Sequence, residues 1–429
     1  MKALEKTSQI LIYLLILAIT NVFAVVEILE EYRIPGVGKP SDFVLIALIL
    51  VLFFGILTRK NKNSPSEIRT LVKYNLVVIG YVCFLIFYTV SILEIESLNY
   101  ALRTASHYLY YTSFLFPLFL IDNEKLFYKY INFLRLGALT TGVIAIVSNI
   151  LGYSIVTGVI SGEEGGFIRV YTPAFFNFFV ILFWFVQSIL KYKSKIKINY
   201  LEMVISALGI LLFLGRTRII VLLLMLIFIF LFVTRASKKK AKVVFAFSFL
   251  LLSVHIFLEY FNFPFEEIID RFYTGFEKLN DPKDALTGRW VSIKLGYNVF
   301  IQYPIFGTGF VHHSTDFYIN HLISSKGQAL TSSADFGLVS ILYTTGLFGF
   351  IIITLFIIRL LKYIYKILNN MRSRKYYTDK YTFGLVVFII ILMVFFIEQI
   401  SSNEFGSRSV AIYLLSAGYA VKFLRIKEK

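Results

Sequence analysis

The chain has 429 residues, of which 58% are hydrophobic and only 16% carry a charge, and its mean hydropathy is +0.75. This composition excludes a soluble globular protein, which needs more charged side chains to cover its surface, and indicates an integral membrane protein. The single cysteine, Cys83, excludes both a disulfide framework and a metal site built on cysteines.

Apolar runs long enough to cross a bilayer, which takes about 20 residues, recur along the whole sequence. We expect 12 transmembrane helices, over residues 8–29, 41–58, 71–93, 98–121, 127–150, 171–190, 199–214, 218–234, 241–261, 334–361, 382–400 and 408–423. The first run is too long and too rich in Ile and Leu for a cleaved signal peptide. The sequence therefore predicts an all-α polytopic membrane protein, with helices 1–9 over 1–261, a large extracytoplasmic loop over 262–333 and helices 10–12 over 334–429.

Lysine and arginine are concentrated in alternate loops, and this bias predicts the orientation. With the N-terminus in the cytoplasm, the inner segments hold 27 of the 43 Lys and Arg residues, and the short outer segments hold 5. Topology therefore explains the formal charge of +17, because basic runs such as 191–197 and 235–242 face anionic headgroups. We expect both termini in the cytoplasm and no nucleic-acid partner.

The long outer segment 262–333 differs from the basic inner loops, since it holds 6 Lys and Arg against 7 Asp and Glu. Apolar residues at helical spacing predict an amphipathic helix over 265–280 at the membrane interface. Thr287 can cap a second helix that ends before Pro304, and the FGTGF that follows predicts a tight turn. It is not a dinucleotide fingerprint, because no strand precedes it and no third glycine follows.

Arginines gather at the expected outer face from separate parts of the chain. Arg169 follows a glycine-rich loop, and Arg289 opens the second helix of the long loop. Arg216 and Arg218 lie where the seventh and eighth helices abut. Guanidinium groups are planar, always charged and able to bind two phosphate oxygens at once. The arginines therefore predict an anionic ligand, most simply a lipid phosphate, although single outer arginines also bind headgroups.

Other ionisable residues lie within the expected helices. Arg103 and His107 are four residues apart on one face of the fourth helix, where they can serve either function or structural pairing. Asp335 and Glu398 lie near the outer ends of the tenth and eleventh helices, and either can be a general base toward a sugar hydroxyl. Asp335 is also explained as a charge at a helix N-terminus, and the two interpretations do not exclude each other. Arg135, near the inner end of the fifth helix, is explained by snorkelling.

Three segments together resemble the O-antigen polymerase and O-antigen ligase superfamily of bacterial membrane glycosyltransferases. FLGRTRIIVLLL at 213–224 is similar to that family's Ser-Arg-Thr element, with Gly215 where a serine is common. GRWVSIKLGYNVFIQYPIFGTGF at 288–310 is similar to its Gly-Arg, aromatic and Pro-x-x-Gly-x-Gly element. SADFGLVSILYTTGLFGF at 333–350 is similar to the helix that follows, and GGFIRVYTPAFFN at 165–177 to a weaker element. Their order and topology fit over most of the chain.

The resemblance implies a GT-C-like fold and a polymerase at the outer face of the bacterial cytoplasmic membrane. The substrates would be oligosaccharide repeat units on undecaprenyl diphosphate, joined into O-antigen or into capsular or exopolysaccharide. The acceptor hydroxyl attacks the anomeric carbon of the donor, and undecaprenyl diphosphate leaves. Ligases of the superfamily usually carry His-Asn where this chain has Asp335 and Phe336, and an Asp there is more similar to polymerases.

On this hypothesis Arg216 and Arg289 hold the diphosphate, and Asp335 is the base or orients the acceptor. Supporting or substrate-binding positions are Arg103, His107, Arg169, Arg218, Trp290, Tyr297 and Glu398. The aromatic residues of the loop (Trp290, Tyr297, Tyr303, Phe310 and Tyr318) offer flat surfaces for sugar rings, or belong to an interfacial belt.

We expect no metal and no cofactor, because the histidines of the outer loop have no carboxylate at ligand spacing. The expected partners are the lipid-linked oligosaccharide and membrane lipids, with a chain-length regulator and a flippase as further candidates. Two alternatives stay open. One is a ligase that transfers finished glycan to a lipid or wall acceptor, and the other is a polysaccharide flippase or transporter, whose internal repeats this sequence does not show.

Overall fold

The computed structural model of the chain describes residues 2–20, 40–58, 66–151, 163–164, 167–168, 174–190, 192–212, 216–233, 289–312, 315–322, 337–397 and 407–424. Regular secondary structure in these ranges is helical, except for the two-residue strands β1 (Glu163–Glu164) and β2 (Phe167–Ile168). These strands pair antiparallel, with Glu163 opposite Ile168. The predicted all-helical architecture is therefore confirmed for the described part of the chain, apart from this short hairpin.

The helices follow the expected apolar runs in order. The first half holds α1 (Lys2–Thr20), α3 (Pro40–Thr58), α4 (Ser66–Phe87), the π-helix η1 (Tyr88–Ile92), α5 (Leu98–Leu109), the 3-10 helix η2 (Tyr110–Phe114), α6 (Leu115–Leu120) and α7 (Glu124–Leu151). The second half holds α8 (Ala174–Leu190), α9 (Tyr200–Leu212), α10 (Arg216–Val233), α13 (Arg289–Gln302), α14 (Asp316–Leu322), α15 (Gly337–Ser373), α16 (Asp379–Phe396) and α17 (Val410–Phe423). The expected ninth helix, 241–261, and the amphipathic helix, 265–280, lie outside the described residues.

Five of the described helical stretches are long and apolar enough to cross a membrane: Ala3–Thr20, Ser66–Ile92, Glu124–Leu151, Gly337–Ser373 and Asp379–Phe396. Five further apolar helices are shorter: Ser41–Ile56, Ala174–Leu190, Tyr200–Leu212, Arg218–Phe230 and Val410–Phe423. The chain is thus a helical multi-pass membrane protein, and its count of 12 spans stays a prediction.

Two expected helices differ from their continuous sequence pattern. The fourth is divided into α5, η2 and α6, because Pro117 has no N–H to bond the carbonyl one turn earlier. The tenth, α15, extends to Ser373 and is interrupted at Gly346, whose φ and ψ are 64° and −178°. Hydropathy shows neither interruption, since both lie within apolar runs.

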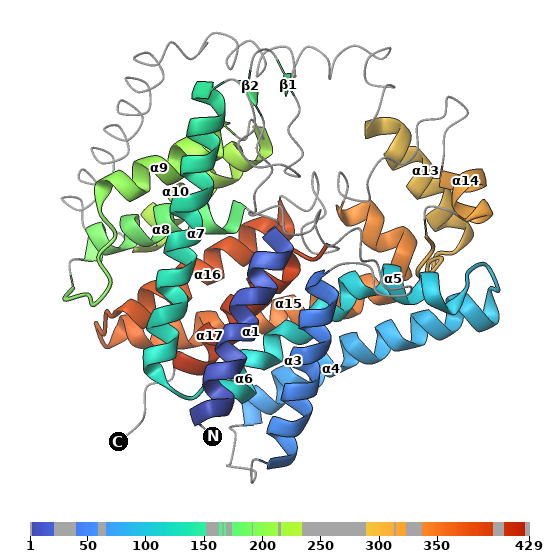
Figure 1. Cartoon of the computed structure of the whole chain (residues 1–429), viewed down its shortest axis with the longest axis horizontal. Coiled ribbons are helices and arrows are strands. Elements are labelled where there is room, and N and C mark those ends of the chain that lie inside the picture. The colour runs from blue at the N-terminus through green and yellow to red at the C-terminus, as the bar shows by residue number, and fades with distance from the viewer. Residues whose placement is uncertain are drawn as a thin grey trace.

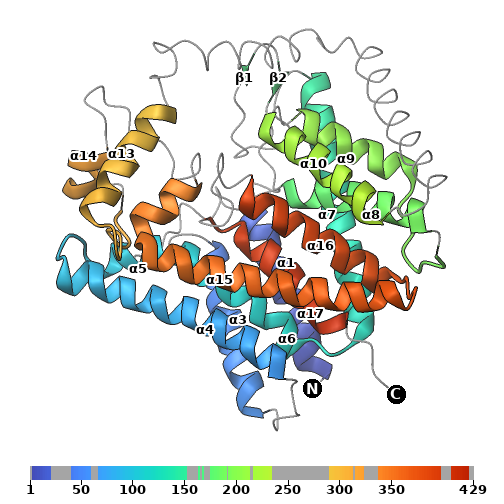
Figure 2. The ribbon, with the colours of Figure 1, turned by 180° about the vertical axis from the view of Figure 1, so that it is seen from behind.

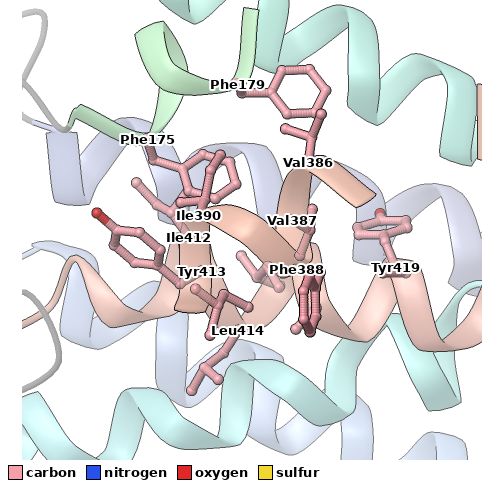
Figure 3. Close-up of a cluster of buried hydrophobic side chains, with 14 of the residues drawn as sticks. Phe175, Phe179, Val386, Val387, Phe388, Ile390, Ile412, Tyr413, Leu414 and Tyr419 are labelled. Carbon is pink, nitrogen blue, oxygen red and sulfur yellow. The ribbon is translucent and has the colours of Figure 1, made fainter. Parts of the chain in front are cut away.

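The hydrophobic core draws on most of the described helices, and one buried cluster of it joins α8, α16 and α17 (Figure 3). Phe175 and Phe179 of α8 point toward the buried side chains of α16 and α17, and the rings of Phe175 and Tyr413 meet edge to face at 5.1 Å. The apolar window of α16 is 78% buried, whereas those of α1, α4 and α7 are 33% buried. A helix that is apolar on all sides belongs inside a bundle, so α16 is enclosed by protein and the others leave faces for lipid.

Ion pairs join the segments that the charge pattern assigns to the cytoplasm. Lys422 pairs with Asp122 at 2.5 Å, Lys380 with Glu124 at 3.1 Å and Lys366 with Glu67 at 2.5 Å. Asp379 accepts hydrogen bonds from the Ser194 hydroxyl and, at 2.8 Å, from the Lys195 amide. These contacts join five of the basic segments at one end of the bundle, as alternating spans require. The assignment of that end to the cytoplasm stays a prediction.

Arg135 does not snorkel toward headgroups as its sequence position predicts. Its guanidinium binds Glu202 of α9 through Nε and Nη2, with the Nε contact at 2.6 Å. The side chain of Glu202 is only 8% exposed, so the pair lies within the α7–α9 interface. The snorkelling prediction is wrong because a partner carboxylate, 67 residues away in sequence, neutralises the charge inside the protein.

Helices α13 and α14 lie together at the edge of the molecule far from the two termini (Figure 1). From behind, α15 runs beside α4 across the molecule (Figure 2), and the two helices are in extensive contact. The described outer-loop helices therefore rest on α15, which in turn rests on the first half of the chain.

Candidate functional site

Helix α13, which begins at Arg289, packs closely against the first turns of α15. A Cβ atom on Gly296 would lie 2.6 Å from Cγ1 of Val339, so the absent side chain permits this approach. Val299 is 1% exposed and packs with Tyr343 of α15.

The turn from Pro304 to Gly309 docks into the interruption of α15 at Gly346. The turn donates two hydrogen bonds to α15: the amides of Thr308 and Gly309 bond the carbonyls of Tyr343 and Thr344 at 2.8 and 2.9 Å. It accepts two in return: the amides of Leu347 and Phe348 bond the carbonyls of Pro304 and Ile305 at 2.9 and 3.1 Å. In a continuous helix the amides of Leu347 and Phe348 would instead bond the carbonyls of Tyr343 and Thr344, four residues earlier in α15. The turn thus replaces the bonds that the interruption removes.

This geometry explains the glycines of the Gly-Thr-Gly sequence. Gly307 and Gly309 have φ values of 70° and 69°, in the left-handed region that glycine adopts without strain. A Cβ atom on Gly309 would lie 1.7 Å from Oγ1 of Thr89. Phe310 is fully buried and packs against Tyr108 with ring centroids 5.3 Å apart. Phe310 is therefore a core residue, and its interpretation as a surface for a sugar ring is wrong.

The other described aromatic residues of the loop differ in exposure. Tyr297 is 56% exposed, whereas Tyr303 and Tyr318 pack partly buried against Val299 and Tyr343. Burial, together with the neighbouring Tyr343, raises the pKa of the Tyr318 phenol above its ordinary value. A phenol is already protonated at neutral pH, so the raised pKa only extends to higher pH the range in which this hydroxyl can act as a hydrogen-bond donor.

Beyond the turn, the chain binds the first half of the protein through η1 and α5. The amide of Phe310 donates to Oγ1 of Thr89 at 3.0 Å, and the amide of His312 donates to Oε2 of Glu96 at 2.9 Å. The ring of His312 stacks on Tyr100 at 4.7 Å. Glu96 was not identified from the sequence as a functional residue. Nothing in the sequence marks it except its place in a short loop between two expected helices.

Helix α5 carries Arg103 and His107 one and two turns beyond Tyr100. Both side chains are half-buried, and Ser97 caps the start of the helix, because its hydroxyl accepts from the amide of Tyr100 at 3.4 Å. Within the described residues, no carboxylate pairs with the guanidinium of Arg103. A half-buried arginine whose charge no described carboxylate neutralises is suited to an anionic ligand.

A buried ion pair joins the start of α3 to the residues just before α17. Nε and Nη2 of Arg408 bind the carboxylate of Asp42 at 3.2 and 3.1 Å. The hydroxyl of Tyr110 donates to the same carboxylate at 2.9 Å, and Arg408 also donates to Ser106 of α5 at 3.4 Å. The pairing neutralises Arg408, so this arginine supports α5 and is not a candidate for phosphate binding.

The remaining predicted positions fall in different places. Arg216 and Arg218 lie in the first turn of α10, which packs on α8, α9 and α16, whereas α13 packs on α14 and α15. The helix starts that carry Arg216 and Arg289 thus belong to separate groups of helices (Figure 1). The structure describes the backbone of Arg216, Arg289 and Trp290 within their helices, and Arg169, Asp335 and Glu398 lie outside the described residues.

Comparison with known proteins identifies one family. Residues 203–354 match the family model described as O-Antigen ligase, which confirms the resemblance to the O-antigen polymerase and ligase superfamily. The matched region runs from α9 to the first half of α15 and includes Arg216, Arg289 and Asp335. No curated protein matches the chain. The match supports a membrane protein of O-antigen ligase or polymerase type, a family involved in glycan transfer.

Proposed function

We propose, starting from the family match over 203–354, that this membrane protein polymerises lipid-linked oligosaccharide repeat units at the outer face of the bacterial cytoplasmic membrane. The donor is a repeat unit on undecaprenyl diphosphate, and the acceptor is the non-reducing end of a second lipid-linked unit. A bond forms between the acceptor hydroxyl oxygen and the anomeric carbon, while the bond from that carbon to the diphosphate oxygen breaks.

The observation that carries the proposal is the family match over 203–354, and two arginines that open helices inside the matched region are the candidates for its anionic substrate. Arg289 opens α13, the helix that packs against α15, and Arg216 opens α10. A leaving diphosphate gains negative charge as the glycosidic bond breaks, and fixed positive groups stabilise that charge. We assign Arg216 and Arg289 to the diphosphate, with Arg218 and Arg169 as supporting charges.

Asp335 is assigned as the base that accepts the proton of the acceptor hydroxyl, or as the group that orients it. It precedes the start of α15 by two residues in sequence, next to the helix against which α13 packs. Arg103, His107, Trp290, Tyr297 and Glu398 are assigned to substrate binding.

A ligase is the second candidate, because the matching family is described as O-Antigen ligase. The Asp-Phe pair at 335–336, in place of the His-Asn that ligases usually carry, favours a polymerase. Purified protein supplied with one defined lipid-linked repeat unit separates the two activities. A polymerase makes a ladder of repeat lengths, whereas a ligase makes no ladder and moves a finished chain to another acceptor.

The arginine assignment is tested in the same assay by Arg289→Lys. This variant should lose most of the activity although it keeps the charge, because one ammonium group cannot hold two phosphate oxygens in the same geometry. Arg69→Lys is the matched control, since Arg69 is exposed on α4 beside the face joined by the Glu67–Lys366 pair. Near-normal ladder formation by Arg289→Lys, at normal membrane abundance, would contradict the assignment.

A further inference from the structure

Residues 308–312 connect two parts of the molecule through four backbone amides. The amides of Thr308 and Gly309 donate to carbonyls of α15, whereas those of Phe310 and His312 donate to Thr89 and Glu96. We name this stretch the connecting segment. Because two of these amides are held by α15 and the other two by Thr89 and Glu96 in the first half of the chain, the segment has one position relative to both parts.

Thr89 lies in the π-helix η1, at the point where it meets the connecting segment. Its hydroxyl donates to the carbonyl of Leu85 at 2.7 Å and accepts from the amide of Phe310 at 3.0 Å. The same hydroxyl also lies 3.5 Å from the carbonyl oxygen of Thr308, and toward the Phe310 amide, which can only donate, its oxygen is the acceptor. Short π-helical turns are frequent at functional sites.

Glu96 holds the other end of the connecting segment. Its side chain is buried, with the residue 8% exposed, and its two oxygens accept from the amides of Ser97 and His312, both at 2.9 Å. A buried carboxylate is costly unless hydrogen bonds satisfy it, and bonds to a charged acceptor are strong. The stacking of His312 on Tyr100 adds a second contact at the same point.

The connecting segment lies between elements that carry proposed substrate-binding groups. It follows α13, which begins at Arg289, and it is fixed against α5, which carries Arg103. We propose that Thr89 and Glu96 are positioning residues for the glycan transfer, which hold the α13–α15 unit in register with α5. This inference rests on the proposed function for its effect on rate, although the contacts themselves do not depend on it.

The first experiment changes Thr89 in the purified protein and measures ladder formation against the concentration of lipid-linked repeat unit. Thr89→Val keeps the shape and removes the acceptor of the Phe310 amide, so the turnover per folded molecule should fall about tenfold or more with the half-saturating concentration unchanged. Thr89→Ser keeps the hydroxyl and should retain most of the turnover. Thr104→Val is the matched control, because that hydroxyl bonds only Tyr100 within its own helix.

Unchanged turnover in Thr89→Val would overturn the inference. So would a higher half-saturating concentration at unchanged turnover, since that result indicates a contact with substrate. Equal losses in Thr89→Val and Thr89→Ser would also overturn it, because the hydroxyl would then have no special role.

A second experiment reads the position of the connecting segment without any activity. In a Cys83→Ser chain, the paired changes Tyr100→Cys and His312→Cys should cross-link with a short bifunctional thiol reagent, since the native rings are 4.7 Å apart. Adding Glu96→Ala should lower the cross-linked fraction several-fold, whereas Glu67→Ala, which removes an exposed carboxylate from α4, should not. An unchanged fraction in Glu96→Ala overturns the role of Glu96. If the unaltered protein forms no ladder, the proposed function is contradicted. The cross-linked fraction still tests, independently of activity, whether Glu96 holds the connecting segment.

Discussion

Gly307 and Gly346 approach each other so closely that neither position has room for a side chain. A Cβ atom on Gly346 would lie 2.5 Å from the amide nitrogen of Gly307, and one on Gly307 would lie 2.6 Å from the amide nitrogen of Gly346. Both residues also have positive φ, which costs other residues about 1–2 kcal/mol. This contact fixes the turn that contains Gly307 in the interruption of α15 at Gly346.

Gly346→Ala should therefore lower the free energy of unfolding by about 3 kcal/mol or more, because the new methyl group meets the carbonyl oxygen of Ile305 at 2.3 Å. The apparent melting temperature of the purified protein measures this change. Gly80→Ala is the control, since nothing lies within 4 Å of a Cβ at that helical position. Equal melting temperatures for the two variants would show that the turn does not depend on Gly346.

The Asp42–Arg408 pair should contribute strongly to stability. Removing one partner, in Asp42→Asn or Arg408→Gln, leaves the other charge buried and should cost about 3–5 kcal/mol. The double variant should lose less than the sum of the single losses, since the two charges interact directly. Thermal unfolding of the four proteins measures this coupling, and additive losses would contradict it. The exposed Lys366–Glu67 pair serves as the comparison and should show no measurable coupling.

Arg103→Gln should weaken binding of the lipid-linked substrate while leaving the protein stable. The guanidinium has no carboxylate partner among the described residues, so its removal breaks no described ion pair. Loss of one charge-assisted hydrogen bond, worth about 1.5–3 kcal/mol, should raise the half-saturating concentration roughly tenfold or more. The same assay on Arg69→Gln controls for loss of charge, and a lower melting temperature of Arg103→Gln at unchanged half-saturation would point to a structural role instead.

The orientation can be tested with single cysteines placed in a Cys83→Ser chain. Tyr297→Cys, at an exposed position of α13, should react with a membrane-impermeant maleimide added to intact cells or spheroplasts. Lys366→Cys, at the end of the bundle where the basic segments meet, should react only after the membrane is permeabilised. The reverse pattern would invert the topology and move α13 away from the outer leaflet.

The sequence predicted the positions of most helices, because burial in lipid or in a membrane bundle imposes a local apolar run. Helix α13 ends at Gln302, before Pro304 as expected, since proline cannot continue a hydrogen-bonded helix. The segments that resemble a known family were also visible in sequence, and the family match over 203–354 confirms that resemblance. The roles of Arg216, Arg289 and Asp335 stay predictions.

Sequence reasoning failed where a residue's environment depends on a distant partner. Arg135 carries the same local pattern as a snorkelling arginine, yet Glu202 of α9 binds it inside the protein. Nothing in the sequence around Arg408, at the start of the last expected helix, marks it as paired, since its partner Asp42 lies 366 residues away in sequence. No local pattern distinguishes a charge that faces headgroups from one that is paired in a helix interface.

Length, hydropathy and the distribution of Lys and Arg determined by themselves that this chain is a helical membrane protein with alternating basic loops, because the bilayer acts on each segment separately. Tertiary structure alone decided that the Gly-Thr-Gly turn docks into α15 and that Glu96 and Thr89 hold the residues beyond it. Those contacts are hydrogen bonds between backbone groups and side chains of different helices, and they exist only once the helices have packed.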